Sequence, residues 1–373
     1  MKFGVLKENN PEKRVSITPE SAAKLIGKGV EVLVEGGAGD SAFLSDKLYE
    51  DAGAKIVDRK TVLSETDFIS FINPLTSEEL DSLGSDKVIL GAMQPFGNKE
   101  LVEKLQSKSI TSFSLELVPR ITRAQAMDIL SSMATIAGYR AVLDAARYLP
   151  KFFPMFMSAA GTIKPAKVLI LGAGVAGLQA IAVARKLGAV VEVFDVRSAV
   201  KEEVKSLGGK FIEVEGATED ASAGGYAVEQ TEEFKQKQSQ MIQDHAIKSD
   251  VVICTAQIPG KKAPVLITKN TVESMNPGSV IIDLAASTGG NCEVTENDKT
   301  IEHNRVVIIG ESNYPTSMAY DASSMFSRNV FNFVSLMIGE KGELNLNFED
   351  EIVAGTCLTH GGEVKNERVK STI

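Results

Sequence analysis

The chain has 373 residues, of which 43% are hydrophobic and 24% charged, and its formal net charge is −9 at pH 7. This length and composition predict two globular domains with sizeable cores, and the acidic balance argues against nucleic acid as a general partner. The three cysteines lack a C-x-x-C spacing and give no sign of a disulfide framework or a metal site, so we expect neither.

No targeting or membrane-spanning segment is expected. The N-terminal sequence MKFGVLKENNPEKR is a short strand followed by charges, unlike a signal peptide. The most apolar stretch, 168–184, is interrupted by three glycines and contains Gln179, so it does not fit a transmembrane helix. We expect no direct membrane insertion, and a role at a membrane only through a partner.

The first part of the chain alternates predicted strands and helices. Thr18 is a suitable N-cap with Pro19 at the first helical position, and Gly29 ends this helix. Strands are expected at 3–6, 30–34, 55–57, 67–72, 87–90 and 110–113, and further helices at 46–52 and 98–107. The alternation is typical of an α/β domain with a parallel sheet.

A long helical stretch, 123–148, is expected to carry the chain from a first domain into a second. The segment that follows it, 151–164, is rich in Phe, Met and Pro and is predicted to be irregular.

The segment 167–197 then carries a dinucleotide-binding fingerprint. The apolar strand 167–171 enters the G-x-G-x-x-G sequence GAGVAG, which opens a helix, and a second strand, 190–194, ends at Asp195. A plain glycine-rich turn is the alternative, but it does not explain why all of these positions are filled in register.

Each fingerprint residue has an expected role. Gly172 permits the tight turn, Gly174 lets a pyrophosphate approach the backbone, and Gly177 lets the helix pack closely on the strand. Asp195 is expected to accept hydrogen bonds from both ribose hydroxyls, which favours NAD over NADP, and Arg197 weakens this preference.

The alternation continues after the fingerprint. Helices are expected at 199–207 and 269–275, and strands at 210–214, 250–255, 280–283 and 306–309. The polar stretch 215–240 interrupts the pattern, and either a lid over a ligand or a plain surface insertion explains it.

A second long helix, about 316–338, is expected to return the chain to the first domain, with a polar tail that is loose at 369–373. We therefore predict an α/β fold of two Rossmann-like domains with parallel sheets, joined by two long crossover helices. The first domain comprises 1–135 and 320–373, and the second, NAD(H)-binding domain comprises 136–319 with a mobile loop at about 215–240.

Few residues are suited to acid–base chemistry. None of the three histidines lies in a recognisable triad or metal cluster, and we interpret His245 as solvated and His360 as structural. Four polar residues at the start of the long helix are more informative: Arg120, Gln125, Asp128 and Ser131. On one face of a helix they would hydrogen-bond a carboxamide, although a surface salt bridge explains them equally well.

At these residues the sequence resembles a known family, the NAD(H)-binding component (domain I) of proton-translocating, Si/Re-specific nicotinamide nucleotide transhydrogenases. The resemblance runs from about residue 1 to 338. It rests on the segments PRITRAQAMDILSSMATIAGYRAV, AAGTIKPAKVLILGAGVAGLQAIA, GAVVEVFDVR, GGYA, IPGKKAPVLIT and GSVIIDLAASTGGNCE.

The resemblance implies the site residues. Arg120, Gln125 and Asp128 match a loop at the nicotinamide end, Ser131 a hydroxyl near the carboxamide, and Tyr226 the tip of a mobile loop. The implied cofactor-binding residues are Arg123, Gly172, Gly174, Val175, Ala176, Gly177, Asp195, Val196, Arg197, Gly225, Gln238 and Gln257.

The resemblance also implies the reaction and the partners. Hydride would pass directly from NADH on this chain to NADP⁺ on a partner subunit, without an acid–base side chain. The chain would form a homodimer and dock an NADP(H)-binding domain, and membrane-spanning subunits would couple the reaction to proton translocation. It would be a separate soluble subunit in the cytoplasm, peripheral at the inner face of the cell membrane.

Two alternatives stay open. Alanine dehydrogenase shares this two-domain plan, but the positions of its substrate-site lysine and histidine align here with Phe71 and Gln94, while its carboxylate-binding arginine aligns with Arg14. Loss of both proton-handling residues should cripple amino-acid oxidation. Transhydrogenases of the resembled family, like alanine dehydrogenase, carry a lysine near the position that Phe71 occupies in this chain. The N-terminal site of this chain has therefore diverged from that family too. The third hypothesis is a non-catalytic NAD-binding module.

Overall fold

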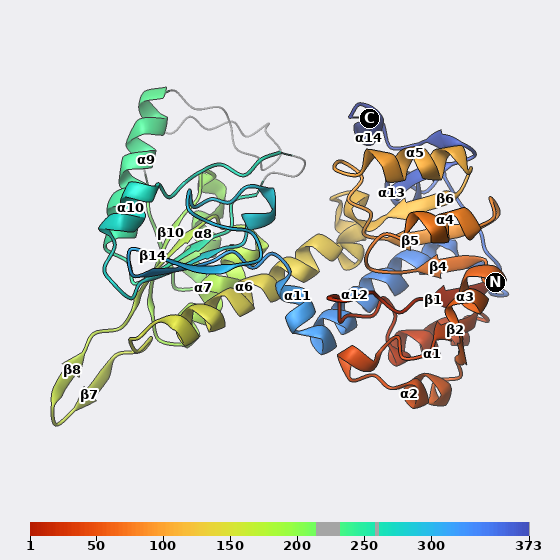
Figure 1. The fold of residues 1–373 in the computed structure, drawn as a ribbon, viewed down its shortest axis with the longest axis horizontal. Helices are drawn as coiled ribbons and strands as arrows, with labels where there is room; N and C mark the ends of the chain where they lie inside the picture. Colours follow the sequence, from red (N-terminus) through yellow and green to blue (C-terminus); the bar gives the residue numbers. More distant parts are fainter. Residues whose placement is uncertain (214–231, 258–260, 373) are drawn as a thin grey trace. The chain divides into compact units, whose positions relative to one another are not determined.

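The computed structural model describes residues 1–213, 232–257 and 261–372, which form two compact units (Figure 1). The first unit comprises Met1–Met133 and Pro315–Ile373, and the second comprises Ala134–Tyr314. The chain leaves the first unit within α6 (Ile129–Tyr148) and returns within the short helix α11 (Tyr314–Ser317). The long helix α12 (Ala319–Val334) belongs to the first unit alone, so the expected second long crossover helix is a short one.

An eight-stranded sheet forms the centre of the first unit, in the order β17-β16-β6-β5-β4-β1-β2-β3. Its strands are β1 (Lys2–Val5), β2 (Glu31–Glu35), β3 (Lys55–Val57), β4 (Phe68–Ser70), β5 (Val88–Gly91), β6 (Thr111–Ser114), β16 (Cys357–His360) and β17 (Glu363–Val364). The pairs within β1–β6 are parallel, as predicted, and β16 pairs antiparallel with β6 and β17.

Helices cover both faces of this sheet. They are α1 (Pro19–Gly27), α2 (Asp46–Asp51), α3 (Arg59–Glu65), α4 (Ser77–Ser82), α5 (Lys99–Ser107), α12, α13 (Glu351–Thr356) and α14 (Glu367–Lys370), with 3-10 turns η1 (Asp40–Ala42), η2 (Leu115–Leu117), η3 (Thr122–Met127) and η7 (Ser335–Met337). Successive strand residues enter different cores: Phe68 packs in one and Ile69 in the other. This two-sided burial explains the continuous apolar strands.

The C-terminal tail corrects the prediction. It supplies β16 and β17 to the sheet, and the segment expected to be loose begins within α14 (Glu367–Lys370), where Val369 is completely buried. Ser112 and Thr359 share a 2.6 Å hydrogen bond between their hydroxyls across β6 and β16. His360 accepts or donates a 3.0 Å hydrogen bond with Thr111, which supports its structural interpretation.

A buried ion pair follows β1. The Arg14 guanidinium donates two hydrogen bonds of 2.7 Å to the Glu12 carboxylate, and the two side chains are only 8% and 3% exposed. Burial acts to raise the pKa of Glu12, but the hydrogen bonds and the charge of Arg14 outweigh it and lower this pKa to about 2.

Replacing Glu12 by Gln is expected to lower the free energy of unfolding by about 3 kcal/mol at pH 7 and by about half as much at pH 3. A carboxyl with a depressed pKa stabilises the fold above its unfolded-state pKa, and this contribution is lost as the pH falls from about 4.5 to about 2. Urea unfolding at both pH values measures it. The exposed Glu78→Gln is the control, and an equal loss at the two pH values would contradict the prediction.

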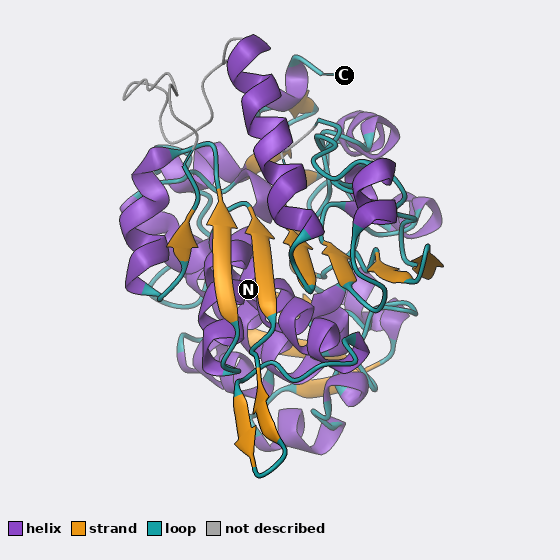
Figure 2. Cartoon of the chain, turned by 90° about the vertical axis from the view of Figure 1, so that its left-hand side faces the viewer, coloured by secondary structure: helices purple, strands orange, loops and turns teal. Residues whose placement is uncertain are grey.

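The second unit is built on a seven-stranded sheet in the order β11-β10-β9-β12-β13-β15-β14 (Figure 2). Its strands are β9 (Lys167–Leu171), β10 (Val190–Phe194), β11 (Lys210–Phe211), β12 (Val251–Cys254), β13 (Val280–Asp283), β14 (Thr300–His303) and β15 (Val306–Ile309). All pairs are parallel except β14 with β15. The predicted α/β fold is confirmed, with a few antiparallel strands added to mainly parallel sheets.

The helices of this unit are α6, α7 (Val175–Lys186), α8 (Lys201–Ser206), α9 (Glu232–Ile247) and α10 (Lys269–Ser274), with the turns η4 (Ser198–Val200) and η6 (Ala286–Thr288). Part of the stretch 215–240 is therefore helical, because α9 begins at Glu232. His245 at the end of α9 is not simply solvated: its Nδ1 lies 2.7 Å from a carboxylate oxygen of Glu192.

The segment expected to be irregular forms a two-stranded antiparallel hairpin, β7 (Phe156–Ser158) and β8 (Gly161–Ile163). It extends away from the sheet of the second unit, at the lower left of Figure 1. All of its strand residues are exposed, and Met157 is 75% exposed.

Candidate nucleotide-binding site

The turn after β9 shows why the first fingerprint glycine is needed. Gly172 has a φ of +105°, which only glycine adopts readily, and its N–H donates a 2.8 Å hydrogen bond to the Phe194 carbonyl oxygen of β10. A side chain at this position would also collide with the Thr255 hydroxyl. The backbone therefore turns sharply at the carboxyl edge of the sheet.

The other two glycines differ from each other. A methyl group on Gly177 would collide with the carbonyl oxygen of Gly172, so this glycine lets α7 pack against the end of β9. A methyl group on Gly174 would meet no atom of the described residues within 4 Å. Open space beside Gly174 is what a pyrophosphate needs in order to approach the backbone.

The N-terminus of α7 faces this space. Gly174 is the N-cap and, having no side chain, supplies no hydrogen bond to the first backbone N–H groups of this 12-residue helix. Such N–H groups bind phosphate oxygens. Two apolar side chains, Val175 at the first position of α7 and Val196 beside Asp195 in sequence, are 40% and 43% exposed. Both properties suit an edge that a nucleotide covers, and Ala176 is half-buried between the glycines.

Asp195 follows β10, as predicted, but its carboxylate already has partners. Oδ2 accepts hydrogen bonds from the Ala173 N–H at 2.7 Å and from Arg197 Nη2 at 2.9 Å. Oδ1 accepts from the N–H and Nε of Arg197 at 2.8 and 2.9 Å. Burial raises the pKa of Asp195, yet these hydrogen bonds hold it below its usual range. A ribose diol can bind this carboxylate only as Arg197 gives up part of its contact.

Polar residues after β12 and β13 complete the edge, and the sequence interpretation missed them. The Thr255 hydroxyl donates to the Leu171 and Gly172 carbonyl oxygens at 3.1 and 3.0 Å. Asn291 accepts from the Ala256 N–H at 3.0 Å and donates to the Ala256 carbonyl oxygen at 2.9 Å. Thr255 directly follows β12, and Asn291 lies in the loop after β13, so a position after the carboxyl end of a parallel strand is the signal that would have identified them.

The Asp283 side chain fixes the loop after β13 by accepting hydrogen bonds from it. This fully buried carboxylate accepts hydrogen bonds from the N–H groups of Ala285, Asn291 and Cys292 and from the Thr295 hydroxyl, at 2.8 to 3.0 Å. The loop it fixes supports the segment of the predicted cofactor residue Gln257, whose amide donates to the Leu284 carbonyl oxygen at 2.9 Å.

The predicted nicotinamide loop lies in the first unit and differs from the expected helix. Residues 122–127 form the 3-10 turn η3, and α6 begins at Ile129 rather than at Arg123. Asp128 caps α6: its Oδ1 accepts from the Ser131 N–H at 3.0 Å and its Oδ2 from the Ser131 hydroxyl at 2.6 Å. Arg120 and Gln125 are both exposed.

Several contacts fix this loop. Arg123, predicted to bind cofactor, donates hydrogen bonds of 2.7 and 2.6 Å to the Asp350 carboxylate. Asn329 and Asn332 of α12 both donate to the Ala126 carbonyl oxygen, at 2.9 and 3.1 Å. The loop is thus attached to α12 and to the start of α13.

Removing the cap separates its structural role from a role in binding. Asp128→Ala is expected to lower the free energy of unfolding by about 1 kcal/mol, whereas Asp128→Asn, which keeps a capping oxygen, should change it by only a few tenths. Thermal unfolding of both variants measures the difference. Equal losses in the two variants would show that the charge of Asp128, and not its capping hydrogen bond, stabilises α6.

Three further predicted residues have limited structural support. Gly225 and Tyr226 lie outside the described residues. Gln238 is half-buried on α9, where no hydrogen bond of its side chain to a described residue is found. In 1–213, 232–257 and 261–372, no group of three or more His, Cys, Asp or Glu residues could hold a metal ion. In the same ranges, no helix has both the length and the apolar character to cross a membrane.

Two family models together match nearly the whole chain. The model "Alanine dehydrogenase/PNT, N-terminal domain" matches residues 4–137, and "Alanine dehydrogenase/PNT, C-terminal domain" matches 141–367. Among curated proteins, the first segment of the NAD(P) transhydrogenase subunit alpha of Rhodospirillum rubrum is 47% identical over 378 residues, covering 98% of this chain and 97% of that protein.

Solved structures agree. A transhydrogenase from Sinorhizobium meliloti superposes with a TM-score of 0.89 at 43% identity, covering 98% of this chain and 100% of that one. An L-alanine dehydrogenase superposes with a TM-score of 0.82 at 26% identity, covering 100% and 99%. The fingerprint geometry and these matches along nearly the whole chain show that the protein belongs to the alanine dehydrogenase/PNT family.

Proposed function

We propose that this chain is the NAD(H)-binding subunit of a proton-translocating transhydrogenase. One observation carries the proposal: over nearly its full length the chain is 47% identical to a transhydrogenase alpha subunit, against 27% and 28% for two alanine dehydrogenases. Bound NADH would supply the hydride, which is transferred to NADP⁺ held by a partner subunit. No side chain of this protein needs to carry a proton in that transfer.

The chain's own residues would bind and orient the nucleotide. The open backbone at Gly174 and the N–H groups of α7 suit a pyrophosphate, and Asp195 suits the ribose diol once Arg197 shifts. Gln125 and Asp128 of the first unit are proposed to orient the nicotinamide carboxamide. Fixed placement of this kind lowers the barrier to a direct transfer between two cofactors.

The structure disfavours amino-acid oxidation. Phe71, at the aligned lysine position, is buried and lies over Gly91, where a methyl group would collide with its ring. Arg14, at the position of the carboxylate-binding arginine, is neutralised by Glu12. Gln94, at the histidine position, cannot exchange a proton near neutral pH.

The same resemblance leads us to propose the assembly. The exposed apolar residues of the β7–β8 hairpin, such as Met157 and Phe156, would be buried in a homodimer. An NADP(H)-binding domain would dock on the dimer, and a membrane-spanning partner would couple hydride transfer to proton movement. The chain would then act at the inner face of the cell membrane through these partners.

A hydride-transfer assay tests the proposal. The purified chain is mixed with an NADP(H)-binding domain of a transhydrogenase, and transfer from NADH to an NADP⁺ analogue is followed. Rapid transfer only in the mixture, slowed by Asp128→Asn or Tyr226→Ala, is the expected result. Turnover of alanine with NAD⁺ by the chain alone would overturn the proposal, and NADH binding without either reaction would favour a non-catalytic NAD-binding module.

A further inference from the structure

The two units repeat the same strand arrangement. In the first unit β1 lies between β2 and β4, and in the second unit β9 lies between β10 and β12, with every pair parallel. Strands β1 and β2 therefore correspond to β9 and β10, which carry the fingerprint and Asp195. The acidic residue at the end of β2 is Glu35.

Glu35 repeats a hydrogen bond of Asp195. The N–H of Lys7, the second residue after β1, donates to Glu35 Oε2 at 2.8 Å. The N–H of Ala173, the second residue after β9, donates to Asp195 Oδ2 at 2.7 Å. Both acids thus face the loop that follows the neighbouring strand, which is where a Rossmann-like domain binds ribose.

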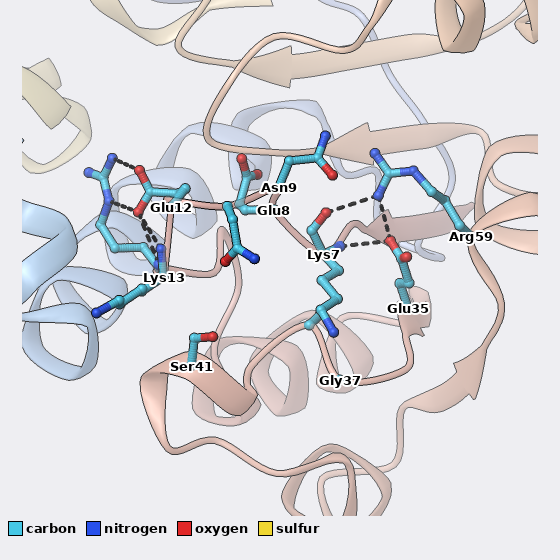
Figure 3. A pocket seen from close by; sticks show the side chains of 12 residues that line it. Lys7, Glu8, Asn9, Glu12, Lys13, Glu35, Gly37, Ser41 and Arg59 are labelled. Carbon is cyan, nitrogen blue, oxygen red and sulfur yellow. Dashed lines mark hydrogen bonds and ion pairs between the residues drawn. The ribbon is translucent and has the colours of Figure 1, made fainter.

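An arginine also contacts each acid, but with a different result. Arg59 Nη1 donates to the same Oε2 of Glu35 at 2.7 Å and to the Lys7 carbonyl oxygen at 2.9 Å (Figure 3). In the described part of the chain, no donor reaches the other oxygen, Oε1. Glu35 therefore keeps a free acceptor, whereas Arg197 and Ala173 occupy both oxygens of Asp195.

A cavity of about 240 Å³ lies beside Glu35 (Figure 3). A cavity of roughly 150 Å³ in a protein is large enough to bind benzene, and pockets for drug-sized ligands begin at roughly 300 Å³. The cavity beside Glu35 lies between these two volumes and suits a small ligand. Some polar groups of its wall already have partners within the protein. Arg14 pairs with Glu12, and the Glu8 carboxylate accepts a hydrogen bond from the Ile72 N–H at 2.6 Å. These groups shape the cavity without needing a ligand.

Other groups of the wall are available. Among the residues that the structure describes, neither Lys7 Nζ nor the Ser41 hydroxyl has a hydrogen bond or an ion pair. The Lys7 ammonium lies over the turn after β2, because a methyl group on Gly37 would come within 3.2 Å of it. Asp40 Oδ2 would lie 3.0 Å from that methyl group, yet it forms no ion pair with Lys7. A cation, a hydroxyl and a free carboxylate oxygen thus surround one small space.

We propose that this cavity is a second ligand site and that it binds a ribose phosphate, either free or as part of a mononucleotide. Two hydroxyls of the sugar would donate to Glu35 Oε1, and the phosphate would pair with the Lys7 ammonium. A dinucleotide does not fit this chemistry. The loop after β1 has no G-x-G-x-x-G, and the next helix, α1, begins only at Pro19, so no helix N-terminus meets a pyrophosphate.

Calorimetric titration with ribose 5-phosphate tests this site, with saturating NAD⁺ present to fill the site after β9. We expect one ribose 5-phosphate per chain. Lys7→Met should weaken binding about tenfold or more, because a charged hydrogen bond is lost. Lys28→Met removes an exposed lysine outside the cavity wall and should leave the affinity unchanged.

Absence of binding in the presence of NAD⁺, or equal affinity losses in Lys7→Met and Lys28→Met, would overturn the proposal. Lys7 Nζ makes no hydrogen bond in the described fold, so the first variant should unfold at the wild-type temperature. A parallel titration with AMP identifies the source of the sugar phosphate: tighter binding than ribose 5-phosphate assigns the site to a mononucleotide, and equal binding assigns it to a free sugar phosphate.

Discussion

Gly174→Ala is expected to weaken NADH binding about a hundredfold or more while leaving the fold intact. Its backbone, with φ of −76° and ψ of −172°, is open to any residue, and a methyl group there meets no atom within 4 Å in the part of the chain that the structure describes. Stability should change by less than about 1 kcal/mol, because loss of a good N-cap and a stiffer unfolded chain act in opposite directions. The methyl group would instead occupy the space proposed for the pyrophosphate.

Gly177→Ala is the matched comparison. Its methyl group would collide with the Gly172 carbonyl, so α7 has to move and the free energy of unfolding should fall by about 3 kcal/mol. Fluorescence titration with NADH and urea unfolding of both variants separate the two effects. If Gly174→Ala binds NADH as tightly as the wild type, the pyrophosphate does not pass over this residue and the proposed binding mode is wrong.

Local chemistry explains why the fingerprint could be predicted. A positive φ at Gly172 and a close backbone contact at Gly177 each require glycine, so these positions are visible in a single sequence. Asp195, the acid after the second strand, could likewise be predicted from its position in the local sequence. The sequence did not reveal that Arg197 already holds Asp195, because that contact depends on a side-chain conformation rather than on spacing.

Long-range pairing and capping explain the errors. Strand β16 pairs with β6 although Thr359 and Ser112 are 247 residues apart, and no local pattern announces such a partner. At the long helix, continuous helical propensity hid the break before Ile129. The sequence interpretation also did not identify Asp128 as the N-cap of this helix, which its hydrogen bond from the Ser131 N–H shows.

Asp283→Asn is expected to lower the free energy of unfolding by about 3 kcal/mol. The carboxylate accepts from three backbone N–H groups and one hydroxyl, and Oδ2 alone receives the N–H groups of Asn291 and Cys292 and the hydroxyl of Thr295. An amide supplies only one acceptor oxygen. The NH₂ group of the asparagine would replace one of the two carboxylate oxygens and would face the groups that donate to that oxygen. Those buried donors would then lose their hydrogen-bond acceptor.

The effect should extend to nucleotide binding. The loop that Asp283 fixes contains Asn291, whose amide holds the segment of Ala256 at the edge of the nucleotide-binding sheet. NADH affinity is therefore expected to fall together with stability. The exposed Asp298→Asn, in the loop between Asp283 and β14, is the control and should retain both properties to within about 0.5 kcal/mol. If Asp283→Asn unfolds earlier but still binds NADH with wild-type affinity, the loop after β13 only stabilises the unit, and the positioning role inferred for Asn291 is wrong.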